Sequence, residues 1–186
     1  MHQIPNIISL IRAILVFPIG FLLYQEAWLD AFILIFIAGV SDGIDGYLAR
    51  TFHWQSRLGS ILDPLADKLL IVIVFIILAH KGIIPSWLAT LVIARDVIIL
   101  AGAVSYQWLT KDLVVSPLWS SKINTALQIA FVLAIMWHLA ISPLNEYILA
   151  YGQIAVAMTV LISGYYYIKC WTSYYIENLK REKQQQ

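Results

Sequence analysis

The sequence predicts an all-α integral membrane protein with six transmembrane helices and both termini in the cytoplasm. Hydrophobic residues make up 61% of its 186 residues, only 12% are charged, and the mean hydropathy is +0.79. Soluble domains are about 45–50% apolar and about 25% charged, so this composition indicates a bilayer. Six crossings of about 20 residues use about 120 residues, which leaves room for short connections only.

Apolar runs bounded by Pro, Gly or polar clusters mark the expected spans. The first run is expected to remain in the mature protein, because Met1 to Asn6 carries no positive charge and Arg12 interrupts the apolar stretch. Residues 1–176 are expected to form one membrane domain, followed by a polar C-terminal tail over residues 177–186. The six spans cover Ile7–Tyr24, Trp28–Val40, Ile61–Ala79, Ile84–Tyr106, Ile123–Ile141 and Tyr147–Ile168.

The positions of lysine and arginine predict the orientation, because these residues concentrate in cytoplasmic loops. The loops on the opposite side contain only Lys81. The link between spans two and three, the link between spans four and five, and the C-terminus should therefore face the cytoplasm. These segments carry Arg50, Arg57, Lys68, Lys111, Lys122, Lys169, Lys180, Arg181 and Lys183.

Charge and cysteine content exclude several classes of function. The net charge of +1, without a long basic run, argues against nucleic acid as a partner. Cys170 is the single cysteine, so no internal disulfide can form, and no Cys/His cluster offers a zinc site.

Two pairs of aspartates stand close together in spans two and three. Asp42 and Asp45 are three residues apart, and Asp63 and Asp67 are four apart. Positions at these spacings share one face of a helix. The polar link between the spans is short, so both pairs are expected to converge on one cavity near the cytoplasmic surface.

Four converging carboxylates need a compensating positive charge inside a membrane, where each acid costs on the order of 2.5–3.5 kcal/mol. Carboxylate oxygens are preferred ligands of hard cations such as magnesium, manganese or calcium. A divalent metal site is therefore the favoured interpretation. The alternative is a salt-bridge network in which Arg50, Arg57 and Lys68 neutralise three of the acids.

Small residues accompany the aspartates. Gly46, Ala49 and Gly59 remove side chains beside the acid cluster and are expected to leave space for a ligand, at a cost of up to about 1 kcal/mol per glycine. Gly39 and Gly43 form a small-xxx-small pair, for which close helix packing is the favoured role.

Two further cations are candidates for substrate binding. Arg95 falls in the middle of span four, where a lone cation usually faces a cavity or a partner. Its neighbour Asp96 points about 100° away around the helix, so the two are not expected to pair. Two interpretations of Arg95 remain open: an ion pair to a motif aspartate, or a contact to lipid phosphate. Lys122 is either a phosphate contact or an ordinary residue of a cytoplasmic loop.

The acid pattern, Asp42-x-x-Asp45-Gly46-x-x-Ala49-Arg50-x8-Gly59-x3-Asp63-x3-Asp67, resembles the signature of the CDP-alcohol phosphotransferase family at every defined position. The resemblance implies a homodimer that binds CDP-diacylglycerol. Together with the loop charges and the acid motif, it leads us to expect an enzyme of the inner (cytoplasmic) membrane, with its active site facing the cytoplasm and with Mg²⁺ or Mn²⁺ as cofactor. It further implies that Asp42, Asp45, Asp63 and Asp67 are metal ligands, that Asp67 is also the catalytic base, that Gly46, Ala49 and Gly59 line the cytidine pocket, and that Arg50 contacts the phosphates.

Two branches of this family differ in the alcohol that accepts the phosphatidyl group. Arg95-Asp96-Val97 and Ser121-Lys122-Ile123-Asn124-Thr125-Ala126 are similar to the pattern of cardiolipin synthases. Phosphatidylglycerophosphate synthases typically carry a second arginine and a second lysine where this chain has Ala103 and Asn124. A dianionic phosphate would need those cations. The resemblance therefore favours phosphatidylglycerol over glycerol 3-phosphate as acceptor.

An ion transporter or channel and a catalytically idle scaffold are the alternatives to this enzyme. Acids in membrane helices also mark the pathways of ion transporters and channels. Such a pathway needs polar residues through the whole bilayer, whereas spans two and three are polar toward one end only. A catalytically idle scaffold is disfavoured because every defined motif position is present.

Overall fold

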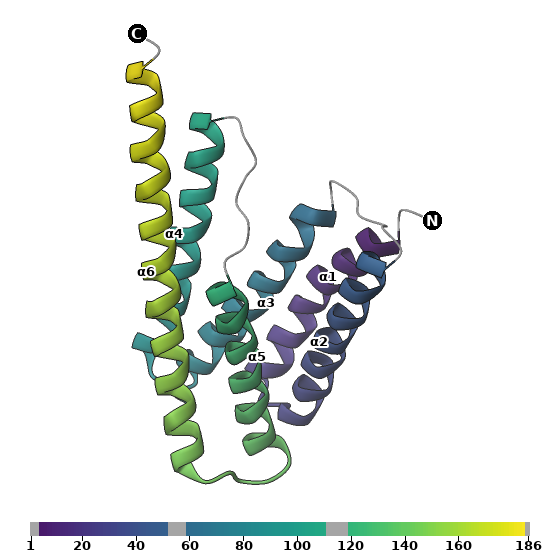
Figure 1. Cartoon of the computed structure of the whole chain (residues 1–186). Coiled ribbons are helices and arrows are strands. Elements are labelled where there is room, and N and C mark those ends of the chain that lie inside the picture. Colours follow the sequence, from purple (N-terminus) through teal and green to yellow (C-terminus); the bar gives the residue numbers. More distant parts are fainter. Residues whose placement is uncertain (1–3, 52–58, 111–118, 185–186) are drawn as a thin grey trace.

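A computed structural model describes residues 4–51, 59–110 and 119–184, and this part of the chain consists of α-helices without a strand (Figure 1). The predicted all-α class is therefore confirmed for these ranges. The helices are α1 (Ile4–Tyr24), α2 (Trp28–Thr51), α3 (Gly59–His80), α4 (Ser86–Thr110), α5 (Trp119–Ala140) and α6 (Glu146–Gln184).

Every predicted span coincides with a helix, but two helices extend well beyond the apolar runs. α2 continues from the apolar run through the acid motif to Thr51, and α6 continues without interruption into the polar tail. Trp119–Ala140 and Glu146–Cys170 are long and apolar enough to cross a membrane by length and composition. The number of crossings and the side on which the termini lie stay predictions.

The helices run alternately up and down in Figure 1. The turns at residues 25–27, 81–85 and 141–145 lie at the lower end, while the last turns of α2 and the first turns of α3 and α5 point to the upper end. α1 packs against α2 and α3, α5 packs against α2 and α6, and α4 packs against α3 and α6. The helix ends that carry the acid motif therefore share one end of the bundle.

The apolar core holds the bundle together. Phe75 of α3 and Phe131 of α5 are 0% and 5% exposed, and their ring centroids lie 6.4 Å apart. Ile19, Leu78 and Met136 belong to the same core and have no exposed surface. Burial of one such side chain contributes about 1.5–3 kcal/mol relative to exposure. Contacts of α3 with α1 and with α5 thus fix the helix whose first turns carry Asp63 and Asp67.

Two turns at the lower end of the bundle are linked by a salt bridge. Glu26 and Gly82 follow α1 and α3 and adopt the left-handed backbone conformation, with φ of 62° and 71°. In each turn the next amide donates to a carbonyl five residues back, Ala27 N to Leu22 O at 3.0 Å in the first. Lys81 Nζ donates to Glu26 Oε1 at 2.8 Å, which joins the two turns.

Candidate active site

The backbone places all four motif aspartates on helices. Asp42 and Asp45 lie in the C-terminal half of α2, and Asp63 and Asp67 lie in the first turns of α3. Each pair occupies one helix face by register, as the spacing predicts. The side chains of the four aspartates lie outside the described residues, so their convergence stays a prediction.

The remaining motif residues lie at the same two helix ends, and their roles also stay predictions. Gly46, Ala49 and Arg50 occupy the last turns of α2, and Gly59 is the first residue of α3. Their side-chain surroundings, and those of Gly43, lie outside the described part, and so does the whole of Arg57. Where side chains are described, no group of three or more His, Cys, Asp or Glu residues is suited to a metal. The predicted donor set, four carboxylates, fits the oxygen preference of Mg²⁺ and Mn²⁺.

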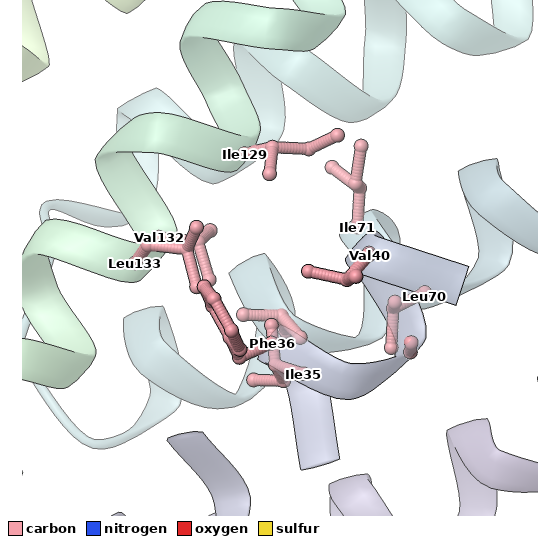
Figure 2. A pocket seen from close by; sticks show the side chains of 11 residues that line it. Ile35, Phe36, Val40, Leu70, Ile71, Ile129, Val132 and Leu133 are labelled. Atoms are coloured by element: carbon pink, nitrogen blue, oxygen red, sulfur yellow. The ribbon is translucent and has the colours of Figure 1, made fainter. Parts of the chain in front are cut away.

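An apolar pocket begins within one helical turn of both acid pairs. It has a volume of 270 Å³ and lies between α2, α3 and α5. The side chains that Figure 2 labels around this space are hydrocarbon, without nitrogen, oxygen or sulfur atoms. Val40 precedes Asp42 by two residues, and Leu70 follows Asp67 by three. The pocket is lined by Ile35, Phe36, Ala38, Gly39, Val40, Leu70, Ile71, Val74, Ile129, Val132 and Leu133.

The expected packing role of Gly39 is wrong within this chain. A Cβ atom added at Gly39 would meet no heavy atom within 4 Å. The reason is that the pocket separates α2 from α3 at this level, so no neighbouring backbone approaches the glycine. Gly39 instead enlarges the apolar pocket.

Arg95 is the centre of a buried polar cluster that connects α4, α5 and α6. Its side chain is almost fully buried, and the residue is 5% exposed. Arg95 Nη2 donates to Ser121 Oγ of α5 at 2.9 Å and to Ser163 Oγ of α6 at 2.6 Å. The guanidinium carbon lies 5.8 Å from the ring centroid of Tyr167. None of these described partners is a motif aspartate, and a contact of Arg95 to lipid phosphate stays a prediction.

The prediction that Arg95 and Asp96 do not pair is wrong. Arg95 Nη1 donates to Asp96 Oδ1 at 2.5 Å, and both residues are buried. The angle of about 100° separates the Cα–Cβ directions of neighbouring residues. It does not separate the ends of long side chains, and the flexible stem of an arginine lets the guanidinium reach the neighbouring carboxylate.

Lys68 extends the cluster to α3. Its Nζ lies 3.5 Å from Asp96 Oδ1, and it directly follows Asp67 in the sequence. Asp96 therefore has two cationic partners among the described residues. Arg95, Lys68 and Asp96 together carry one positive charge, which offsets part of the negative charge of the four motif aspartates.

Lys122 has a different environment from Arg95. It is exposed at the start of α5, and its Nζ lies 5.2 Å from the ring centroid of Trp119. The structure does not bring it into the Arg95 cluster. A phosphate contact by Lys122 stays a prediction.

Sequence reasoning missed a second group of buried polar residues. Asn124 and Gln128 of α5 are 0% and 1% exposed. Thr159 of α6 donates to Asn124 Oδ1 at 3.1 Å. The available signal was a polar residue every fourth position in an otherwise apolar span, which marks one helix face.

Comparison with known proteins identifies relatives of this chain. The sequence model of the CDP-alcohol phosphatidyltransferase family matches residues 2–164. The cardiolipin synthase (CMP-forming) of Rattus norvegicus is 35% identical over 183 residues, which cover 88% of this chain and 60% of the relative. A chloroplastic CDP-diacylglycerol–glycerol-3-phosphate 3-phosphatidyltransferase of Oryza sativa subsp. japonica is 36% identical over 149 residues, which cover 71% of this chain and 45% of the relative.

A bacterial relative shows a similar level of sequence identity to this chain. A putative cardiolipin synthase of Mycobacterium tuberculosis is 38% identical over 108 residues, which cover 56% of this chain and 50% of the relative. The chain thus spans roughly half the length of the curated relatives that it matches. Both acceptor branches occur among them at similar identity, so similarity alone does not select the acceptor.

Proposed function

The chain belongs to the CDP-alcohol phosphatidyltransferase family, and we propose that it transfers a phosphatidyl group from CDP-diacylglycerol to phosphatidylglycerol. The products are cardiolipin and CMP. We further propose that it acts as a homodimer in the inner (cytoplasmic) membrane, with the acid motif facing the cytoplasm. The positive residues at the upper end of the bundle support this orientation.

The buried cation Arg95 beside the acid motif is the observation that carries the proposal. A guanidinium with 5% exposure in an apolar bundle is costly unless charged or polar groups surround it. Asp96 balances one cation, while Lys68 supplies a second within 3.5 Å of the same carboxylate. A lysine and an arginine beside the acid motif suit a site that binds a phosphate ester.

The reaction needs a base and an in-line approach of the acceptor. In this proposal Asp67 takes the proton from a hydroxyl group of phosphatidylglycerol. The hydroxyl oxygen then forms a bond to the phosphorus that carries diacylglycerol, and the bond from that phosphorus to the CMP oxygen breaks. CMP leaves with the bonding electrons, and the proton passes from Asp67 to water.

The other motif residues bind the donor. Asp42, Asp45 and Asp63 complete the ligand set, and bound Mg²⁺ or Mn²⁺ supplies charge neutralisation at the pyrophosphate. Gly46, Ala49 and Gly59 leave space for cytidine, and Arg50 contacts the phosphates. The apolar pocket accommodates an acyl chain of a lipid substrate.

Ala103 and Asn124, which stand where phosphatidylglycerophosphate synthases typically carry cations, favour phosphatidylglycerol as acceptor. Its phosphodiester carries one negative charge, whereas the phosphate of glycerol 3-phosphate carries up to two. Asn124 is neutral and lies one helical turn from Ser121, which binds Arg95. The similarity to a glycerol-3-phosphate 3-phosphatidyltransferase keeps that reaction as the alternative.

The experiment that tests the proposal uses the purified full chain in lipid nanodiscs with CDP-diacylglycerol and Mg²⁺. Phosphatidylglycerol and glycerol 3-phosphate are supplied in separate reactions, and CMP and the lipid product are measured. Asp67→Asn is expected to lower kcat by about 10²–10⁴-fold, the contribution of a general base. Ion flux into proteoliposomes that contain the same chain, without CMP release, would instead indicate the transporter class.

A further inference from the structure

A second apolar depression, here called the outer groove, lies between α2 and α5. It has a volume of 560 Å³ and continues from the apolar pocket, because Phe36 and Leu133 line both. From these two residues it extends away from the acid motif, toward the lower end of the bundle in Figure 1. Its other lining residues are Phe32, Ala130, Ala134, Trp137 and Leu144.

Two small residues make room for the outer groove. Ala130 and Ala134 are four residues apart in α5, so they lie on one face of the helix. Large aromatic side chains stand around them. The ring centroids of Phe32 and Phe36 lie 6.2 Å apart, and the ring of Trp137 meets that of Phe32 edge-on at 6.3 Å. A groove with an aromatic wall therefore replaces the filled contact that larger residues of α5 would make.

Hydrogen bonds fix the far end of the outer groove. Trp137 Nε1 donates to Ser142 Oγ at 3.1 Å, and Leu144 N donates to His138 Nδ1 at 2.9 Å. Both bonds join α5 to the turn at residues 141–145, and each involves a residue that lines the groove. The groove thus has a defined end at Trp137 and Leu144.

The apolar pocket opens on the surface of the bundle beside the outer groove. Phe36, Val40 and Ile129 line the pocket and are 51%, 45% and 38% exposed. Because the proposed function places the bundle in a bilayer, this opening meets hydrocarbon chains. An acyl chain can therefore lie in the pocket and the groove at once.

The two cavities form a path that begins at the acid motif. Phe32 and Val40 of α2 are eight residues apart, which is about 12 Å along the helix. Ile129 and Trp137 of α5 have the same separation. Asp42 follows Val40 by two residues, so the path starts where the pyrophosphate of the donor lies in the proposed function. The lipid whose chain enters this path is therefore the donor.

We propose that the outer groove binds the distal part of one acyl chain of CDP-diacylglycerol, whose first part lies in the apolar pocket. The inference rests on the proposed function and names residues that decide which donors are used efficiently. Since the bilayer is itself apolar, the groove selects by shape and packing and not by removal of the chain from water. Contacts increase with chain length until the chain reaches Trp137.

The test compares Ala130→Phe, which fills the outer groove, with the matched control Ala150→Phe. Both alanines are exposed, and Ala150 of α6 lines neither of the two described cavities. CMP release is measured in nanodiscs with dioctanoyl or dioleoyl CDP-diacylglycerol, Mg²⁺ and each acceptor in turn. For Ala130→Phe, kcat/KM for the dioleoyl donor should fall about tenfold, as for an overpacked contact. The fall should be smaller for the dioctanoyl donor, whose chain ends in the pocket, and the control should keep both values.

Photolabelling locates the chain without turnover. A CDP-diacylglycerol with a diazirine at the end of one oleoyl chain should label the peptide that contains Trp137, and Ala130→Phe should reduce this label. Equal labelling of the groove and of the exposed face of α6 would overturn the inference and leave the groove to bulk lipid. An equal fall in kcat/KM for both donors would also overturn it. Absence of CMP release by the wild type with either acceptor would instead contradict the proposed function, whatever the labelling shows.

Discussion

Arg95 Nη1 lies 2.5 Å from Asp96 Oδ1, so two consecutive residues of α4 form a buried ion pair. The same guanidinium donates to Ser121 of α5 and Ser163 of α6. Lys68 brings α3 to the same carboxylate. One ion pair thus connects four helices beside the acid motif, and a change there should affect both stability and substrate binding.

Asp96→Asn is expected to destabilise the chain strongly. The substitution keeps the size of the side chain but leaves Arg95 buried without its counter-charge. Removing one partner of a buried pair costs about 3–5 kcal/mol. The free energy of unfolding, measured by denaturant titration in mixed micelles, should fall by that amount.

Glu26→Gln is the matched control for this charge removal. It breaks the Lys81–Glu26 salt bridge, whose side chains are 21% and 58% exposed. Exposed salt bridges contribute about 0–1 kcal/mol, so little loss of stability is expected. Equal losses for Asp96→Asn and Glu26→Gln would contradict the central position of the buried ion pair.

Gly152→Ala should disturb the contact between α5 and α6. An added Cβ would lie 2.8 Å from Cδ2 of Phe131, and Phe131 is itself buried against Phe75. Because the ring must move, we expect a loss of about 1–3 kcal/mol, as for other overpacked cores. Thermal and denaturant unfolding of the purified variant measure this loss.

Gly164→Ala on the same helix provides the comparison. Its added Cβ would lie 3.9 Å from Cγ of Arg95, which is an ordinary contact. The higher helix propensity of alanine should then raise stability by up to about 1 kcal/mol. A Gly152→Ala protein as stable as Gly164→Ala would refute the close approach of Phe131.

Gly39→Leu should fill the apolar pocket without a clash. An added Cβ has no heavy atom within 4 Å, and the pocket volume is 270 Å³. Competition with an acyl chain is expected to raise KM for long-chain CDP-diacylglycerol about tenfold, with a smaller rise for Gly39→Ala. Identical KM values for the wild type and both variants would exclude an acyl chain from this pocket.

Removal of divalent metal should abolish CMP release, and Mg²⁺ or Mn²⁺ should restore it. Binding of metal to the folded state also raises Tm, which gives a second measurement independent of turnover. The rise in Tm with Mn²⁺ should be present in the wild type and absent in Asp42→Asn. Full activity in excess chelator would rule out the metal site.

Apolar run lengths were sufficient to predict the helices. Tyr24 and Trp28 bound α1 and α2 in both the sequence and the structure, because the residues between them interrupt the apolar pattern. The extension of α2 to Thr51 was not visible from hydropathy. Polar motif residues can continue a helix when its backbone hydrogen bonds remain within the segment.

Side-chain contacts were harder to predict than helices. Spacing on a helix gives the Cα–Cβ directions of Arg95 and Asp96 but not the reach of the guanidinium, so their pairing was not predicted. The sequence marks Asn124 as the replacement for a cation, whereas its contact to Thr159 depends on how α5 packs against α6. Such contacts between helices follow from tertiary structure, which a single sequence does not specify.

Competition between the two acceptors tests the central claim most directly. The purified chain receives CDP-diacylglycerol, Mg²⁺ and equal concentrations of phosphatidylglycerol and glycerol 3-phosphate, and mass spectrometry identifies the lipid products. We expect cardiolipin as the main product, formed in equal amount to CMP. Phosphatidylglycerophosphate as the main product would contradict the account.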